Sequence, residues 1–546
     1  MSIDSEIRAD VQESPAQWAA DKSYDAVPYS VCSFPQTRPD RLAATATLLG
    51  MNPPSPDRCR VLELGCASGG NLIPLALAHP NSEFVGIDLS PRQIKQGQDV
   101  ARELGLSNLK LQAMSILDWG ADSEQFDYIL THGVYSWVPP QVQERILQIS
   151  ARQLSPQGVA YVSYNTYPGW HARAAIREMM WFHTRHLEDA VERIGAARQL
   201  MAFLAAATGS PGGKSNGQAP ARSDGGYGAL LQQELKLLQR VPDTYLLHEH
   251  LEEFNEPLYF HQFVQRVADH GLQYLAEAQI NSMMVGRYGP EIEKTLRGFS
   301  GGLLDIEQYM DFLRNRMFRQ TLLCHAEVRL AERLQPAAME SLYIASVAEP
   351  SSKQVCFEPE QVEEFRAPGN ICLQSRDPLM KAAMWCLHEN DSVPVSFAEL
   401  IGCAHRMLND AGVSDGASGE AFAGRLLNAF AAGVIELSAS APCYTAKISQ
   451  KPAASPYARL RAREGGNIVN YRLEPVALGE PSRLVLSHLD GQHDTDALVR
   501  VVVEWTRSAG RDQGATAPTA APIEERAVEY IQRFLRAAGR HALLHG

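Results

Sequence analysis

Short apolar runs alternate with helix-compatible segments through the first third of the chain. Ser90 followed by Pro91 is typical of a helix start, because serine caps free backbone N–H groups and proline fits the first turn. Strands separated by helices of this length predict βαβ units and a parallel, doubly wound sheet, the Rossmann-like α/β class. The expected strands are 60–64, 83–88, 109–113, 126–131 and 158–164.

The middle of the chain has a helical pattern that we expect to interrupt this sheet. Residues 171–258 predict a helical insertion, after which residues 271–280 return to the sheet as one of its last strands. Residues 342–347 are a weaker candidate for the other last strand. Residues 305–334 carry apolar side chains at helical spacing and predict a long helix.

The last third predicts an α+β region. Residues 393–440 have the order helix, turn, helix and strand, which is winged-helix-like. The second of these helices carries only one basic residue, Arg425, which argues against a DNA-reading role. Residues 208–228 and 511–522 are rich in Gly, Ser, Pro and Ala and have the composition of a flexible insertion and a linker. We therefore expect three domains, at 1–205, 206–345 and 346–546.

Composition excludes several function classes. The chain has 546 residues with 50 Lys+Arg and 63 Asp+Glu, a net charge of −13, which disfavours binding to nucleic-acid phosphates. Nine cysteines without a CxxC motif predict neither a disulfide framework nor a zinc site, and no other metal site is expected. The sequence shows neither a signal-peptide pattern nor a run of about 20 apolar residues. We therefore expect a cytoplasmic protein without a membrane partner.

A small-residue turn follows the first predicted strand, at the start of the first helix. It reads Glu63-Leu-Gly65-Cys-Ala67-Ser-Gly69-Gly70, and small residues there let a ligand approach the helix N-terminus closely. Asp88 follows at the end of the second strand, where a carboxylate can accept hydrogen bonds from both ribose hydroxyls. NAD and S-adenosylmethionine both carry that ribose, so these two motifs leave both cofactors open.

Four motifs together resemble one enzyme family. The chain resembles class I S-adenosylmethionine-dependent methyltransferases, and within them the group with a methyltransferase regulatory domain, which includes rickettsial outer-membrane-protein lysine methyltransferases. The resemblance is clear from about residue 20 to residue 330 and fainter beyond. Its motifs are VLELGCASGGN (61–71), FVGIDLS (84–90), FDYILTHGVYSWVP (126–139) and SYNTYPGW (163–170).

The resemblance implies roles for residues at the ends of the predicted strands. Glu63, Gly65, Ala67 and Gly69 would hold the methionine part of S-adenosylmethionine, and Asp88 and Leu89 the ribose. Met114, Ser115 and Ile116 would border the adenine, and Thr131 and His132 would lie beside the methyl group. The side chains predicted to act on the acceptor are His132, Tyr135, Trp137 and Tyr29.

Aromatic and hydroxyl groups suit an amine acceptor, because ring faces attract a cation and a tyrosine hydroxyl can orient it. Trp170, His248 and Glu249 could form a lid over that site. The alternative for the aromatic residues is that they close the core over the cofactor.

The resemblance implies an enzyme that methylates nitrogen, with a protein lysine as the acceptor. Methylation of a small molecule at nitrogen or oxygen is an alternative within the class. A regulatory protein that retains the nucleotide-binding fold is a second alternative, and an NAD-dependent oxidoreductase a third. The sequence leaves the oligomeric state open, a dimer included.

Overall fold

The computed structural model describes residues 32–120, 124–208, 225–413, 419–508 and 522–546. Tyr29 lies outside these residues, as do residues 209–224 of the predicted insertion and 511–521 of the predicted linker. No described helix is both long and apolar enough to cross a membrane.

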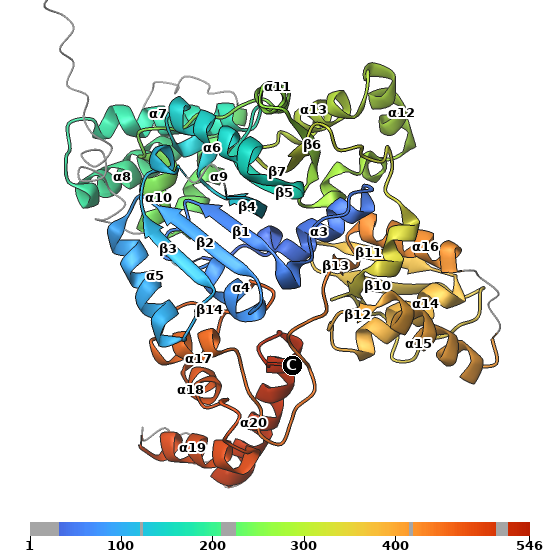
Figure 1. Ribbon diagram of the computed structural model, residues 1–546. Coiled ribbons are helices and arrows are strands. Elements are labelled where there is room, and N and C mark those ends of the chain that lie inside the picture. The colour runs from blue at the N-terminus through green and yellow to red at the C-terminus, as the bar shows by residue number, and fades with distance from the viewer. Residues whose placement is uncertain (1–31, 121–123, 209–224, 414–418, 509–521) are drawn as a thin grey trace, which may run out of the picture.

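A seven-stranded sheet of order β3-β2-β1-β4-β5-β7-β6 organises the first part of the chain (Figure 1). Neighbouring pairs among β1 to β5 are parallel, as the alternation of strands and helices predicted. Strand β7 runs antiparallel to both β5 and β6. The strands are β1 (Arg60–Leu64), β2 (Glu83–Asp88), β3 (Leu109–Ala113), β4 (Phe126–Thr131), β5 (Leu154–Asn165), β6 (Leu272–Glu277) and β7 (Phe318–His325).

Strands β6 and β7, the last two strands of the sheet in chain order, confirm one prediction and correct two. Strand β6 lies where residues 271–280 were expected to rejoin the sheet. The prediction for 342–347 was wrong, because β8 (Tyr343–Ala345) pairs with strands of another sheet. The single helix expected over 305–334 was also wrong. Helix α13 (Leu303–Arg314) ends at Asn315, whose left-handed φ of 50° turns the chain into β7.

Helices cover both faces of the sheet and bury a hydrophobic cluster on each. Ser90 caps the helix after β2, where its hydroxyl accepts the N–H of Gln93 (3.2 Å), as predicted. The helices that connect or flank the parallel strands are α3 (Pro39–Leu48), α4 (Leu72–Ala78), α5 (Pro91–Glu103) and α6 (Pro140–Gln153).

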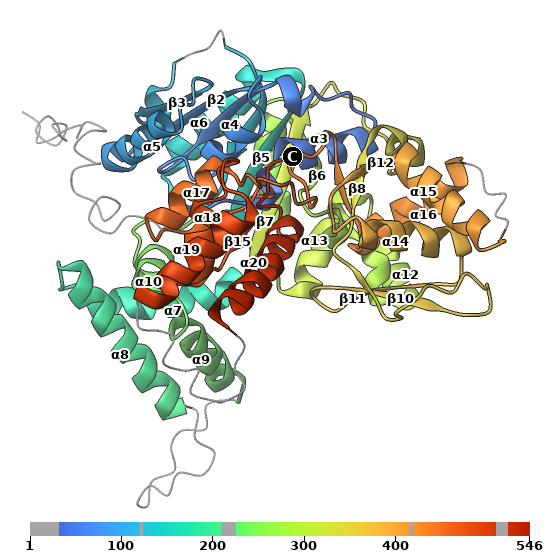
Figure 2. The same cartoon turned by 90° about the horizontal axis from the view of Figure 1, so that it is seen from below.

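A helical insertion separates β5 from β6, as predicted, and its first four helices have a core of their own. Helices α8 and α9 project away from the sheet (Figure 2). Residues 206–208 and 225–228, at the edges of the predicted flexible segment, belong to these helices. The insertion consists of α7 (Trp170–Thr184), α8 (Ala190–Thr208), α9 (Gly225–Leu238), α10 (Asp243–His250) and α11 (Phe260–Asp269).

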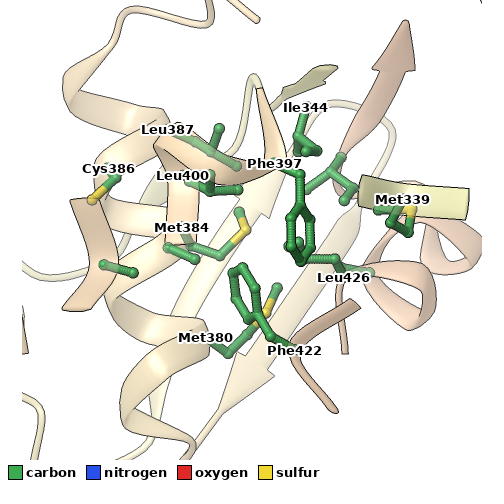
Figure 3. Packing of buried hydrophobic residues seen from close by; sticks show 14 of the residues in the cluster. Met339, Ile344, Met380, Met384, Cys386, Leu387, Phe397, Leu400, Phe422 and Leu426 are labelled. Atoms are coloured by element: carbon green, nitrogen blue, oxygen red, sulfur yellow. The ribbon is translucent and has the colours of Figure 1, made fainter. Parts of the chain in front are cut away.

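A second module follows the sheet and has the predicted order of helices and strands. Its core packs methionine, leucine and phenylalanine side chains between three helices and a small sheet (Figure 3). Ala44 and Leu48 of α3 join this core, so the module is docked on the first helix described. Its elements include α14 (Pro378–Glu389), β12 (Val395–Ser396), α15 (Phe397–Asp410), α16 (Gly419–Ala432) and β13 (Glu436–Ser438).

Helices α14 and α15 are joined by a disulfide between Cys386 and Cys403, which the sequence analysis did not expect. The cysteine spacing contains no signal for this pair, because the two residues meet only through the packing of two helices.

The C-terminal part is mainly helical and packs against the sheet domain. Tyr457, Val469 and Leu473 belong to the cluster on one face of the large sheet, so this part is anchored there. Its other buried residues form a separate core. The elements are α17 (Pro456–Arg463), β14 (Ile468–Val469), β15 (Pro475–Val476), α18 (Glu480–Ser487), α19 (Thr495–Ser508) and α20 (Ile523–Arg540).

The predicted domain boundaries at 205/206 and 345/346 stay predictions. The large sheet, however, takes five strands from before residue 205 and two from after it.

Candidate functional site

The residues predicted at the ends of the parallel strands lie at one edge of the sheet. Strands β1 to β4 are parallel, so the segments that follow them emerge side by side. In open α/β sheets, ligands bind at the carboxyl ends of the strands. This edge therefore brings together Glu63, Asp88, Ser115 and Thr131, which the sequence separates by almost 70 residues.

The turn after β1 is held open by its small residues. The N–H groups of Gly65 and Cys66 both donate to the carbonyl of Ile87 (2.9 and 3.0 Å), which ties the turn to β2. Gly65 has a φ of +79°, and a Cβ there would lie 2.4 Å from Cγ2 of Val134. Only glycine fits this position, because a side chain would meet both backbone strain and a clash.

Asp88 connects the turn to the next helix. Its Oδ2 accepts the N–H of Ala67 (2.8 Å), and its Oδ1 accepts the N–H of Ser90 (2.9 Å). Ala67 has a φ of +48°, a left-handed conformation that this contact supports. The turn role considered for Asp88 is thus present. Leu89, the neighbouring prediction, is exposed.

Glu63 is buried at the end of β1. Its Oε1 accepts a hydrogen bond from Nδ2 of Asn71 (3.1 Å), whereas its Oε2 is buried without a hydrogen-bond partner among the described residues. Burial raises the pKa of Glu63 to about 8, against the opposing effect of Asn71. A buried acceptor without a donor costs free energy, and a cationic donor would remove that cost.

A segment ahead of α3 closes over this carboxylate. The Phe34 N–H donates to Oδ1 of Asn71 (3.2 Å), and Nδ2 of Asn71 donates to the Thr37 hydroxyl (2.9 Å) as well as to Glu63. Sequence reasoning missed Phe34 and Thr37, and assigned no role to Asn71 although it ends the VLELGCASGGN motif. The connecting contacts span more than 30 residues, so no local pattern reveals them.

His132 lies just beyond β4 within a group of aromatic rings. The rings of Phe34, Tyr161 and Phe318 have centroids 3.7, 5.8 and 6.0 Å from the His132 ring. His132 Nδ1 and the Tyr161 hydroxyl are hydrogen-bonded at 2.8 Å. Burial lowers the pKa of His132 to about 3, so the imidazole is neutral at physiological pH.

The other residues predicted along this edge differ in their burial and in their hydrogen bonds. Thr131 is fully buried, and its hydroxyl has no hydrogen-bond partner among the described residues. Ser115 caps a short 3-10 helix, η4 (Ile116–Asp118), by accepting the N–H of Leu117 (3.2 Å). Ser115 and Ile116 are partly exposed and stay accessible at the edge after β3.

Tyr135 and Trp137 lie in the interior rather than in an open site. Tyr135 is fully buried, with its ring edge-on to Phe263 of α11 (5.4 Å). Trp137 is buried against Trp170 (5.9 Å). This geometry favours the alternative considered for these rings, that they close the core behind the cofactor site.

The residues considered for a lid lie inside the helical insertion. His248 of α10 is fully buried, and its Nδ1 lies 3.6 Å from Oε2 of Glu252, which follows the end of that helix. Glu249 lies 4.0 Å from Arg173, whose guanidinium covers the Trp170 ring. The described residues contain no group of His, Cys, Asp and Glu that could hold a metal ion.

Comparison with known proteins decides between the cofactors. A methyltransferase domain family matches residues 55–196, and the predicted methyltransferase regulatory domain family matches residues 242–325. An uncharacterized protein of Rickettsia prowazekii, RP789, is 33% identical over 490 residues, covering 88% of this chain and 85% of that protein. The chain belongs to the S-adenosylmethionine-dependent methyltransferases with a regulatory domain. The enzyme's cofactor is S-adenosylmethionine.

The similarity extends over the whole fold. The structure of PKMT2 from Rickettsia typhi superposes with a TM-score of 0.80 at 29% identity, covering 95% of this chain and 100% of that one. The same protein in complex with AdoHcy superposes with a TM-score of 0.79.

The PKMT C-terminal winged helix domain family matches residues 450–543. This match lies within the predicted C-terminal region, but beyond the 393–440 segment on which the winged-helix prediction rested.

Proposed function

We propose that this methyltransferase transfers methyl groups to lysine side chains of proteins. The likeness to PKMT2 from Rickettsia typhi over 95% of this chain, C-terminal winged helix domain included, supports this proposal. A small-molecule methyltransferase has no evident use for the large modules that follow the sheet, whereas a protein acceptor offers a surface for them to contact.

The described residues fit the cofactor. The unpartnered Oε2 of Glu63 would receive the ammonium of the methionine part, and the Asp88 carboxylate would accept from the ribose hydroxyls. Gly65, Ala67 and Gly69 would line the methionine part, and Ser115 and Ile116 the adenine. S-adenosylmethionine would supply the methyl group: a neutral amine would attack the methyl carbon and AdoHcy would leave as the neutral sulfide. The chain must therefore position and desolvate the amine.

His132 would position the acceptor rather than take its proton. An imidazole with a pKa near 3 is far weaker as a base than a lysine amine with a pKa of about 10.4. Burial holds the pKa of Tyr161 well above its usual value, so this hydroxyl keeps its proton and can donate it to Nδ1 of His132. The other ring nitrogen is then protonated and can donate to a carbonyl oxygen of the acceptor, which leaves the lone pair of the amine free to attack the methyl group.

Labelling of a cell lysate tests the proposed acceptor. The enzyme is incubated with lysate and methyl-labelled S-adenosylmethionine, and the products are separated into proteins and small molecules. We expect label on mono-, di- or trimethylated lysine in peptides identified by mass spectrometry. Label confined to small molecules would contradict a protein acceptor.

Replacing Asp88 by Asn is expected to weaken AdoHcy binding by about 1.5–3 kcal/mol, because a charged acceptor becomes neutral. Isothermal titration calorimetry measures the loss. Asp127→Asn is the matched control, since Asp127 also accepts a backbone N–H, that of Arg60 (2.8 Å), but lies at the opposite end of the sheet. Equal affinity in both variants would remove Asp88 from the site.

A further inference from the structure

Six aromatic rings form a connected band on the surface of the enzyme, which we call the aromatic band. Each ring has its centroid within 6.1 Å of the next, and none of the six residues is buried. Phe299 and Phe312 are 63% and 48% exposed. The band consists of His171, Tyr167, Tyr259, Phe312, Tyr309 and Phe299.

The helix that carries part of the band has its polar side buried and much of its apolar side exposed. Glu307 and Asp311 of α13 are buried and pair with the buried Arg319 of β7 (3.1 and 2.8 Å). Leu304, Phe312 and Leu313 of the same helix are exposed. The ion pairs fix α13 to the sheet, so its apolar side chains face solvent in a rigid arrangement.

Exposed apolar side chains gather around this band. Phe299, Leu303 and Phe318 are exposed together with the apolar side of α13, and nothing in the described part of the chain covers them. Grouped apolar side chains of this size on a protein surface mark an interaction site. In Figure 1, α13 and α12 (Pro290–Phe299) lie beside the β6 and β7 side of the sheet.

The band begins at the edge where the methyl site lies. Tyr167 follows the end of β5, and its loop is bound to the segment before β7, because the Gly169 N–H donates to the Arg316 carbonyl (2.9 Å). The next residues lead to Phe318, whose ring lies 6.0 Å from His132. A chain bound along the band can therefore place one side chain at the end of β4.

The rings at the start of the band and an exposed carboxylate near them suit a cationic side chain of the partner. Glu178 is exposed and acts electrostatically on the Tyr167 hydroxyl, as does Glu256, which pairs with Arg266 (2.7 Å). Aromatic faces and carboxylates attract ammonium groups, and a net charge of −13 repels nucleic-acid phosphates.

We propose that the aromatic band binds the methyl-acceptor protein as an extended segment with apolar side chains on alternate positions around its target lysine. In an extended segment, alternate side chains point to the same side, so the flanking residues can lie on the rings. Large rigid rings supply contact area at a low cost in conformational entropy. This inference rests on the proposed lysine acceptor. It adds that the aromatic band selects the residues on either side of the target lysine.

Direct peptide binding tests the band. The probes are two fluorescent lysine-centred peptides of roughly 15 residues, about 50 Å when extended. One carries Val and Phe on alternate flanking positions, and the other carries Ser and Gly there. Fluorescence anisotropy with the full-length, AdoHcy-loaded enzyme gives each Kd. We expect the apolar peptide to bind about tenfold or more tightly, and Phe312→Ala or Phe299→Ala to weaken it about tenfold.

Phe203→Ala is the matched control, because Phe203 is 67% exposed but lies on α8, away from the band. We expect this variant to bind the apolar peptide like the unmodified enzyme, and all three variants to retain AdoHcy affinity and melting temperature. Equal binding of the two peptides, or equal loss in all three variants, would overturn the proposal. Light scattering provides a further test, because it measures the molar mass in solution. A dimer that becomes a monomer in Phe312→Ala would show that the band is a contact between two copies of the chain, and would overturn the proposal.

The same variants distinguish this inference from the proposed function. Methylation of N-acetyl-lysine amide, which is too short to reach the band, should be unchanged in Phe312→Ala. Selective peptide binding that depends on the aromatic band, without methylation of either lysine probe, would support the band as a docking site and contradict the lysine acceptor. Methylation of both peptides with equal kcat/KM would support the lysine acceptor and overturn the proposed role of the aromatic band in binding it.

Discussion

Binding of S-adenosylmethionine is expected to tighten about ninefold from pH 6 to pH 7 and about fivefold more from pH 7 to pH 8. Burial raises the pKa of Glu63 to about 8 in the cofactor-free enzyme, so this carboxyl is mostly protonated at pH 6 to 7. An ammonium at Oε2 favours the carboxylate, so binding must release the proton. Calorimetry at several pH values measures the affinity, and buffers of different ionisation enthalpy count the released protons.

The Glu63→Gln variant is the control for this pH dependence. Glutamine keeps the size of the side chain and the acceptor for Asn71, but it does not titrate. We expect its affinity to be lower at pH 8 and nearly constant from pH 6 to 8. If the unmodified enzyme shows no proton release, or the variant keeps the pH dependence, then Glu63 does not meet the ammonium.

Glu63 also makes the stability of the cofactor-free enzyme depend on pH. This stability falls as the pH rises, whereas the affinity for the cofactor increases. The pKa of Glu63 is 4.5 when it is unperturbed and about 8 in the folded chain. Its contribution to the stability of the cofactor-free enzyme is therefore fully present below pH 4.5 and is lost as the pH rises through 8. Bound cofactor restores this stability, so the increase in Tm caused by AdoHcy should grow from pH 6 to pH 8.

The core of the site could be predicted because it is built from strand ends. Glu63, Asp88 and Thr131 each complete a recognisable apolar run, and the parallel order of the strands places those ends together. The closing layer could not be predicted, because Phe34 and Tyr161 reach Asn71 and His132 through contacts that only the folded chain creates.

Strand β7, which lies between β5 and β6, shows a different limit of sequence reasoning. The run Leu322-Leu-Cys324 in β7 is buried on both faces, and such a run has neither strand alternation nor a helical stripe. Arg319 within the same strand argues against burial until Asp311 and Glu277 are known to pair with it (2.8 and 2.6 Å). The strands β14 and β15 have only two residues each, too few to predict the winged helix at 450–543.

A fragment of residues 1–205 is expected to be insoluble and unable to bind AdoHcy, although it contains every residue predicted to contact the cofactor. It ends before β6 and β7, and β5 pairs with β7 from Ala160↔Leu323 to Asn165↔Phe318. Without β7, β5 becomes a long apolar edge strand, which promotes aggregation. The soluble fraction after expression and calorimetry with AdoHcy measure the outcome.

A longer fragment, residues 1–341, is the matched control. It retains β6, β7 and the ion pairs of Arg319 with Glu277 and Asp311, while it lacks the modules that follow. We expect it to be more soluble than 1–205 and to bind AdoHcy, because all seven strands are present. A soluble 1–205 fragment that binds AdoHcy would show that the five parallel strands form a complete domain. The helical insertion would then be an addition to that domain rather than a connection within its sheet.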